Sequence, residues 1–260
     1  MAVPRAAGEP KPAADAYLLS YPKTGRTWLR ALVGRALVRH DRLPEARLLE
    51  TDVLTRMAGL PVAAFYHDGS AMLDGHTWRD LPADKSAYAG KRVLLLGRDV
   101  RDTLVSAYFQ ATRRIGVYTG PIADFVRDER YGADKVLAFY RHWDLARHVP
   151  RAFAFLRYEA MHADPAAALA RTLEFLGARD VAEATIAEAV GYARFDNLRR
   201  VEAEGFFGDP ALRAGVAADP ESYKVRRGKV GGFRDYLSDG DIAWIDARVA
   251  EAGCEFTRPD

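Results

Sequence analysis

The segment 21–29, YPKTGRTWL in one-letter code, constrains the fold of this chain more than any other. An apolar run at 16–20 before it predicts a short buried strand, and an apolar face over 27–39 predicts a helix. Gly25 permits the tight turn between them. Such a turn directs several backbone N–H groups and the positive end of the helix to one point. Lys23 adds a cation there, so the segment predicts a loop that binds phosphate or sulfate.

The loop differs from the phosphate loop of nucleoside triphosphatases. That loop requires Gly, four further residues, and then Gly-Lys followed by Ser or Thr. Here Lys23 precedes Gly25, and neither of the Gly-Lys pairs at 90–91 and 228–229 is followed by Ser or Thr. The Mg²⁺ site that accompanies the triphosphatase loop is therefore not expected either.

The segment 22–28 resembles the 5′-phosphosulfate loop of sulfotransferases that use 3′-phosphoadenosine 5′-phosphosulfate (PAPS), whose usual form is Pro-Lys-Ser-Gly-Thr-Thr-Trp. The resemblance implies a P-loop-like fold in which Lys23 stabilises the leaving phosphate and Trp28 faces the adenine. The residues expected to bind PAPS in this loop are Lys23, Thr24, Gly25, Arg26, Thr27 and Trp28.

A second segment, 92–106, reads as a strand, then Arg-Asp, then an amphipathic helix. It is similar to the segment of this family that holds the nucleotide's 3′-phosphate, and the matching residues are Arg98 and Ser106. Eight residues span just over two helical turns, so Ser106 can lie on the same side as the strand-end arginine.

Two later segments extend the resemblance. The strand at 152–158 ends in Tyr158-Glu159, similar to the family's Tyr-Glu-Asp, whose tyrosine touches the adenine. Phe195 is expected to form the opposite wall of the adenine site. The segment 223–233 resembles the family's Arg-Lys-Gly loop, which closes over the 3′-phosphate through the residues that match Arg226, Arg227 and Gly228. Because these ordered segments cover most of the chain, it is identified as a member of the sulfotransferase family.

Histidine is the natural candidate for the base that takes the acceptor's proton, since it titrates near neutral pH. The family's Lys-Thr-His reads Asp74-Gly75-His76 here, so we predict His76 as the catalytic base. The family lysine is absent from this place, and Arg26 is expected to supply the missing cation. Structural roles are expected for the other histidines, which are His40, His67, His142, His148 and His162.

Short apolar runs alternate with helical patterns along the chain, which predicts a single α/β domain with a central parallel sheet flanked by helices on both faces. The predicted strands are 16–21, 70–75, 92–98 and 152–158. The predicted helices are 27–39, 50–58, 99–114, 121–128, 134–148, 165–176, 180–191 and 239–252. Ligands bind beyond the carboxyl ends of such strands. Lys23, His76, Arg98 and Tyr158 all follow predicted strands, so one shared site is expected.

The chain divides into a flexible tail at 1–15 and a sulfotransferase domain at 16–260. Glycine, proline and charge dominate the segment 203–229 without any period, and a loop of this length is typical of a lid. Because this segment ends in the arginine-rich match, we expect the lid to order over bound nucleotide.

Composition restricts the function. A net charge of +2 over 260 residues disfavours a nucleic-acid binder. The single cysteine, Cys254, forms no internal disulfide, and no apolar run reaches the roughly 18 residues of a membrane span. No signal peptide is recognised, so the protein is expected in the cytoplasm without a membrane partner. No metal-binding pattern is found, and none is expected.

We therefore predict an enzyme that transfers a sulfuryl group from PAPS to a hydroxyl of a small molecule or secondary metabolite. Two alternatives are an ATP-dependent kinase on a related core and a non-catalytic nucleotide-binding module. The acceptor pocket is expected from 56–75, 113–122 and 202–222. The sequence does not specify the acceptor or the oligomeric state.

Overall fold

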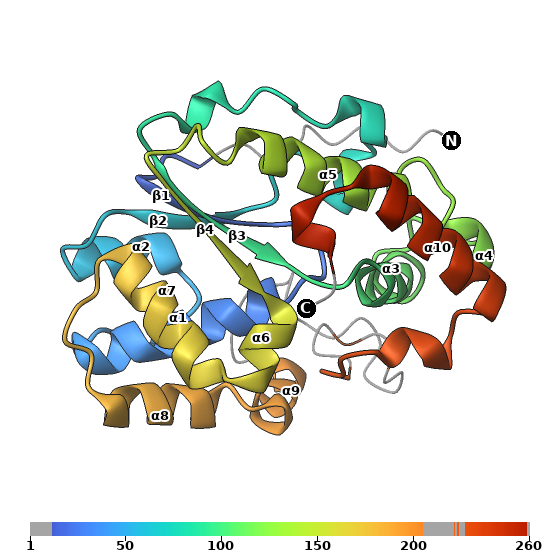
Figure 1. Ribbon diagram of the computed structural model, residues 1–260. Helices are drawn as coiled ribbons and strands as arrows, with labels where there is room; N and C mark the ends of the chain where they lie inside the picture. The colour runs from blue at the N-terminus through green and yellow to red at the C-terminus, as the bar shows by residue number, and fades with distance from the viewer. Residues whose placement is uncertain (1–11, 205–220, 222, 224–226, 259–260) are drawn as a thin grey trace.

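A parallel sheet forms the centre of the protein (Figure 1). The computed structural model describes residues 12–204, 221, 223 and 227–258. Within these residues the sheet has the order β2-β1-β3-β4. The strands are β1 (Ala16–Ser20), β2 (Ala63–Tyr66), β3 (Arg92–Gly97) and β4 (Ala152–Arg157). Every pairing is parallel, so all the strands end at the same edge of the sheet. The predicted α/β class is confirmed.

The inner strands explain why the sheet is stable in this register. Every residue of β1 is buried, and Leu18 pairs with Phe65 on β2 and with Leu94 on β3. Strands that are buried on both faces have nearly continuous apolar sequences, as β1 and β3 do. Both sheet faces therefore have to be covered by helices.

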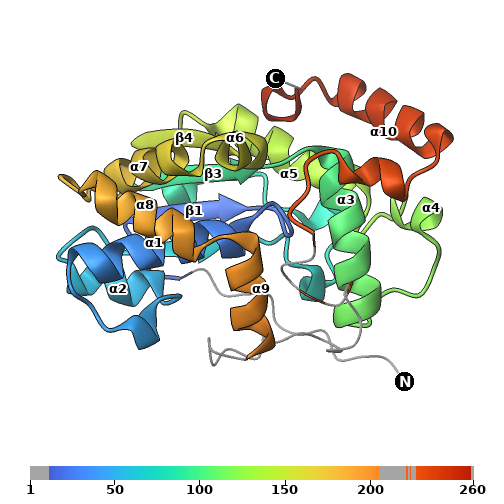
Figure 2. The ribbon, with the colours of Figure 1, turned by 90° about the horizontal axis from the view of Figure 1, so that it is seen from below.

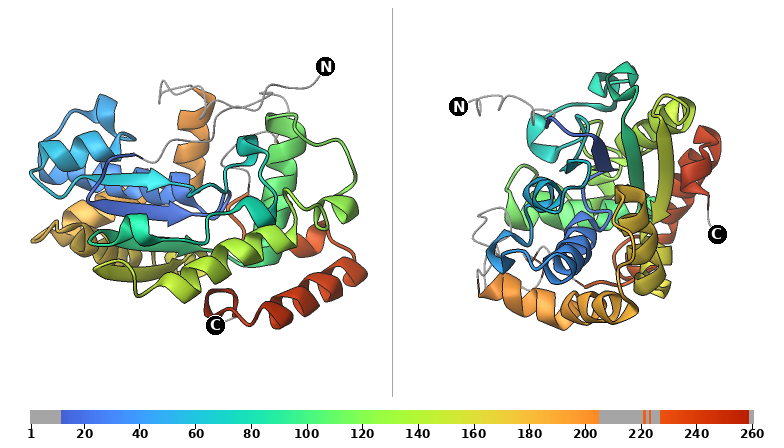
Figure 3. Two further views of the ribbon diagram at one scale, coloured as in Figure 1. Left: turned by 90° about the horizontal axis from the view of Figure 1, so that it is seen from above. Right: turned by 90° about the vertical axis from the view of Figure 1, so that its left-hand side faces the viewer.

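Helices cover both faces, as Figure 1 and the right-hand view of Figure 3 show. On one side Leu18 and Leu94 pack into a core with α1, α7 and α8, and on the other side Tyr17 and Leu95 pack into a core with α3, α5 and α10. The first group with its neighbours comprises α1 (Arg26–His40), α2 (Thr51–Met57), α6 (Tyr158–Ala163), α7 (Pro165–Leu176) and α8 (Glu183–Tyr192). The second group comprises α3 (Val100–Phe109), α5 (Ala133–Ala146) and α10 (Asp239–Ala252), with α4 (Ile122–Phe125) beside it. Helix α9 (Phe195–Ala203) belongs with the first group, because Leu198 packs into the same core as α1 and α8.

The prediction of a strand at 70–75 is wrong. The strand is β2, which ends at Tyr66, and the chain then turns through Asp68 and Gly69, whose φ angles are 50° and 77°. The turn is closed by Ser70, whose Oγ donates to the His67 carbonyl oxygen at 2.6 Å. The apolar run that suggested a strand instead forms a short 3₁₀ helix over Met72–Asp74.

Helix boundaries follow the expected capping chemistry. Asp164 accepts a hydrogen bond from the Ala167 N–H at 2.9 Å, and Pro165 is the first residue of α7, as predicted. Asp99 caps α3 by accepting from the N–H groups of Arg101 and Asp102. The segment predicted as one helix over 99–114 is α3 followed by a π-helical turn at Gln110–Arg114. Helices α6 and α9 were not predicted.

The remaining predictions about organisation fall partly outside the described residues. Most of the predicted lid at 203–229 and residues 1–11 of the predicted tail lie there. The described end of that tail contacts the sheet, because Ala14 is buried and Asp15 donates its N–H to the Val62 carbonyl oxygen. Among the described residues, no helix is long and apolar enough to cross a bilayer.

Candidate functional site

The loop between β1 and α1 has the geometry of an anion cradle. Lys23 and Gly25 both adopt positive φ angles, of 74° and 100°. A Cβ added to Gly25 would lie 2.6 Å from Cδ2 of Tyr158, so only glycine fits there. Thr24 is fully buried and closes the turn by donating to the Tyr21 carbonyl oxygen at 2.9 Å. Among the described residues, no side chain caps the first turn of α1, so its N–H groups are available to an anion.

Arg98 joins this loop to the end of β3. Its Nη1 donates to the Lys23 carbonyl oxygen at 3.2 Å, and its guanidinium lies 4.3 Å from the centroid of the Tyr158 ring. Its Nη2 donates to the Lys229 carbonyl oxygen at 3.1 Å and lies 3.7 Å from Asp102. The buried Nε has no hydrogen-bond acceptor among the described residues, which leaves one donor of this partly buried cation for an anion. Figure 2 shows α3 continuing from this end of the sheet.

Aromatic rings gather beside the two cations. Trp28 and Tyr158 meet edge to face, with ring centroids 5.7 Å apart. His162 lies near both rings, and its Nε2 is 3.0 Å from the Gly228 carbonyl oxygen. Gly228 packs so closely on Phe195 that an added Cβ would lie 2.9 Å from Cδ2 of that ring. The predicted adenine-binding residues thus come together. His162, for which a structural role was expected, is exposed next to them.

The segment that ends in Gly231–Phe233 is fastened to α3. The Asp102 carboxylate accepts from the N–H groups of Gly231 and Phe233 at 2.8 and 2.9 Å. Arg227, predicted to bind the 3′-phosphate, forms an ion pair with Asp235 at 2.9 Å. Ser106 is buried on α3, one helix turn before Gln110. Arg226 lies outside the described residues.

Lys23 also contacts the π-helical turn that follows α3. Its Nζ donates to Oε1 of Gln110, the first residue of the π-helical turn, at 3.2 Å. A π-helical turn often marks a functional position in a helix. The amine of Lys23 therefore joins the loop at 23–28 to the π-helical turn at Gln110–Arg114, where the segment 113–122 that was expected to border the acceptor begins.

The structure separates the two histidines of the turn after β2. His67 follows the last residue of β2, and its Nδ1 lies 2.8 Å from the carbonyl oxygen of Ser20, the last residue of β1. His76 lies further along, beyond the 3₁₀ helix, where its Nδ1 is 3.1 Å from the Gly69 carbonyl oxygen. The His76 carbonyl oxygen accepts from Nζ of Lys135, which is fully buried on α5. His67 is thus the histidine at the carboxyl edge of the sheet.

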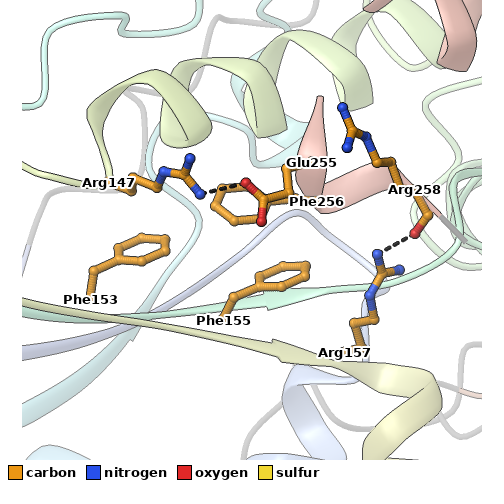
Figure 4. Close-up of a pocket in the computed structure, with 7 residues that line it drawn as sticks. All are labelled: Arg147, Phe153, Phe155, Arg157, Glu255, Phe256 and Arg258. Carbon is orange, nitrogen blue, oxygen red and sulfur yellow. Dashed lines mark hydrogen bonds and ion pairs between the residues drawn. The ribbon is translucent and has the colours of Figure 1, made fainter. Parts of the chain in front are cut away.

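A separate pocket of about 500 Å³ lies against β4, on the face turned away from α1 (Figure 4). Its floor is formed by the rings of Phe153, Phe155 and Phe256. Its charged rim is internally paired, because Arg147 bonds to Glu255 and Arg157 donates to the Arg258 carbonyl oxygen. None of the predicted site residues lines this pocket, so it is distinct from the cradle.

Comparison with known proteins identifies the family. Residues 13–253 match the sulfotransferase domain family. The chain belongs to the sulfotransferase family. It is 28% identical to cytosolic sulfotransferase 17 of Arabidopsis thaliana, over 91% of this chain and 73% of that protein. It is 23% identical to flavonol 3-sulfotransferase of Flaveria bidentis, over 91% of this chain and 81% of that one.

Solved sulfotransferase structures share the fold. Mouse sulfotransferase SULT7A1, complexed with PAP (3′,5′-diphosphoadenosine), superposes on this chain with a TM-score of 0.60 at 22% identity. The match covers 92% of this chain and 84% of that one. Retinol dehydratase in a complex with retinol and PAP gives 0.65 at 18% identity, covering 96% and 84%. The predicted enzyme class is confirmed, and the kinase and the non-catalytic module are not favoured.

Membership in the sulfotransferase family changes how the two histidines are interpreted. The family's Lys-Thr-His is expected at a strand end, and the strand end here is Phe65-Tyr66-His67. The signal was present in the sequence, because the apolar run 63–66 leads directly into His67. No lysine stands two places before either histidine, since these positions hold Phe65 and Asp74. Arg26, the first residue of α1, stays the predicted replacement.

Proposed function

We propose that this sulfotransferase transfers the sulfuryl group of PAPS to a hydroxyl group of a small molecule, with His67 as the general base. The loop at 23–28 would hold the 5′-phosphosulfate and Arg98 with Ser106 the 3′-phosphate. Trp28 and Tyr158 would contact the adenine. The observation that carries the proposal is the hydrogen bond from Arg98 to the Lys23 carbonyl oxygen, which brings two cationic groups to one edge of the sheet.

The residues present fit such a co-substrate. Glycine is required at Gly25, and the N–H groups at the start of α1 lack a capping side chain within the described residues. The buried Nε of Arg98 has no acceptor among those residues either. A dianionic phosphosulfate complements the first two features. A second phosphate complements the third.

His67 is suited to accept a proton at Nε2. A carbonyl oxygen only accepts hydrogen bonds, so the contact with Ser20 requires hydrogen on Nδ1 of the neutral ring. Nε2 then carries the lone pair, as a general base requires. As the acceptor oxygen forms its bond to sulfur, its proton passes to Nε2 and the bond from sulfur to the phosphate oxygen breaks. Lys23 stabilises the negative charge that the phosphate gains.

The relatives indicate the acceptor class. Two named relatives are a flavonol 3-sulfotransferase and a flavonol 4′-sulfotransferase, so hydroxylated secondary metabolites are the first acceptors to test. We propose that the reaction takes place in the cytoplasm, as the names of the cytosolic relatives suggest.

A thermal shift series tests the nucleotide part of the proposal. PAP at about 100 times its dissociation constant should stabilise the fold by roughly 2.7 kcal/mol, whereas ATP should leave the melting temperature unchanged. Incubation with PAPS and a panel of flavonols should then yield products heavier by one sulfuryl group. Stabilisation by ATP and not by PAP would refute the proposal.

A further inference from the structure

A buried charged cluster lies directly behind the turn that carries His67. The Asp68 side chain is almost completely buried and accepts three hydrogen bonds. Nζ of Lys85 donates at 2.7 Å, the Tyr88 hydroxyl at 2.6 Å and Nε1 of Trp143 at 3.0 Å. Trp143 belongs to α5, and the other two donors lie between β2 and β3. The carboxylate therefore joins three segments behind the turn.

The cluster is fully engaged. Lys85 also donates to the Pro82 carbonyl oxygen and lies 5.0 Å from the centroid of the Trp143 ring. Burial lowers the pKa of Lys85, and the adjacent Asp68 opposes that shift. Burial, reinforced by Asp68, raises the pKa of Tyr88, so its hydroxyl keeps the proton that it donates. A buried charge pair is weak evidence for stability alone, because an apolar replacement often serves as well.

The position of Asp68 gives the cluster a second role. Asp68 is the residue after His67, and its φ of 50° is unusual for a residue other than glycine. Its side chain is fixed by the three donors while its backbone forms the turn. On the other side, His67 is held by the Ser20 carbonyl oxygen and by Ser70. The direction in which the imidazole leaves the sheet edge thus depends on a backbone conformation that the buried carboxylate maintains.

We propose that Asp68, held by Lys85, Tyr88 and Trp143, is a positioning residue that orients His67 for proton transfer. The inference rests on the proposed role of His67. Asp68 does not touch the substrate, and it acts only through the turn. A small displacement of a catalytic group lowers the rate strongly, while the nucleotide cradle is built from other segments. Loss of a donor should therefore lower kcat and leave PAPS binding intact.

The first test uses the substitution Tyr88→Phe, which removes one donor and retains the ring. We expect kcat to fall about 10-fold while KM for PAPS stays within twofold of wild type. The matched control is Tyr17→Phe. Tyr17 is equally buried, and the centroids of its ring and the Tyr88 ring are 5.1 Å apart. Its hydroxyl, however, donates to the Pro12 carbonyl oxygen and not to Asp68. Tyr17→Phe should keep wild-type kcat.

A second variant replaces both charges, as Asp68→Asn combined with Lys85→Met, so that no buried charge is left without its partner. It should show the same loss of kcat with unchanged KM for PAPS. Equal kcat in Tyr88→Phe and Tyr17→Phe, or a loss of PAPS binding that matches the loss of kcat, would overturn the proposal.

The decisive measurement repeats Tyr88→Phe in a His67→Ala background. Groups that act through one another are not additive, so Tyr88→Phe should lower kcat no further once His67 is absent. A further 10-fold loss would mean that the cluster acts elsewhere. If His67→Ala alone keeps wild-type turnover, the proposed base is wrong. If His67→Ala is inactive but Tyr88→Phe is not impaired, only the positioning role fails.

Discussion

The nucleotide cradle and the turn after β2 lie at the same edge of the sheet but differ in how they are built. The cradle is made of backbone: two positive φ angles, the start of α1, and a glycine against Tyr158. The turn after β2 also has two positive φ angles, at Asp68 and Gly69, but side chains hold its conformation, with the buried Asp68 carboxylate behind His67. A backbone device requires fixed residue types at fixed spacing, and a side-chain device depends on partners far away in the sequence.

This difference explains which predictions hold. The loop at 21–29 could be predicted because glycine, lysine and proline each have a local physical reason there. The prediction of His76 as the base depends on a strand at 70–75, whereas the strand in the structure ends at Tyr66, directly before His67. Which of the two histidines is the base stays a prediction. The comparison between cradle and turn can be tested by substitutions in each.

The largest effect is expected from substitution of His67. His67→Ala should lower kcat by roughly 10²- to 10⁴-fold, because the acceptor's proton loses its base, while PAP still binds. His76→Ala is the control and should keep most activity. Steady-state kinetics with saturating PAPS distinguish the two. The reverse result, with His76 essential and His67 dispensable, would restore the assignment made from sequence.

The cradle should respond in binding. Arg98→Met removes a partly buried cation and should weaken PAP binding by roughly 10- to 100-fold, as calorimetry would measure. Arg39→Met is a suitable control, because Arg39 is exposed at the opposite end of α1. Equal affinity of both variants for PAP would place the 3′-phosphate elsewhere.

The backbone character of the cradle predicts an effect of a single methyl group. Gly25→Ala should lower the stability by about 1–3 kcal/mol and impair PAP binding, because the new Cβ meets Tyr158 and the φ is unfavourable. Gly253→Ala also has a positive φ, of 58°, but nothing lies within 4 Å of its added Cβ. Chemical denaturation should show the smaller loss for Gly253→Ala. Equal losses would mean that strain alone matters.

The smallest effect concerns the loop of His76. Burial lowers the pKa of Lys135 from 10.5 to about 8. At a pH between these two pKa values, Lys135 is protonated in the unfolded chain and neutral in the folded chain. The free energy of unfolding therefore rises with pH in this range. From pH 7 to 9 the wild type should gain about 1 kcal/mol relative to Lys135→Met, measured by urea unfolding. A constant difference would mean that the Lys135 amine, which bonds to the His76 carbonyl oxygen, stays charged.

Much of the fold could be predicted from sequence, and the reasons are physical. Strands β1, β3 and β4 follow from apolar runs, and helix α7 has the predicted bounds 165–176, with proline at its first position. Helix α9 was not predicted, because its nine residues are too few to show a clear period beside a segment rich in glycine and charge. Lys85 and Trp143 are 17 and 75 residues away from Asp68 in the sequence. No local sequence pattern predicts partners at such separations.

Site residues that follow a strand end or belong to a local motif could be placed from the sequence. The structure brings Lys23, Arg98, Trp28 and Tyr158 together, as their strand ends suggested. The position of His162 beside these rings could not be predicted, because a histidine in a short helix carries no signal of its own.

A crystal structure with PAP and an acceptor bound would test the account most directly. The account predicts the 5′-phosphate on the N–H groups of residues 24–28, the 3′-phosphate at Arg98, and the acceptor hydroxyl within hydrogen-bonding distance of Nε2 of His67. A nucleotide bound in the pocket beside β4, or an acceptor hydroxyl that contacts His76 and not His67, would contradict it.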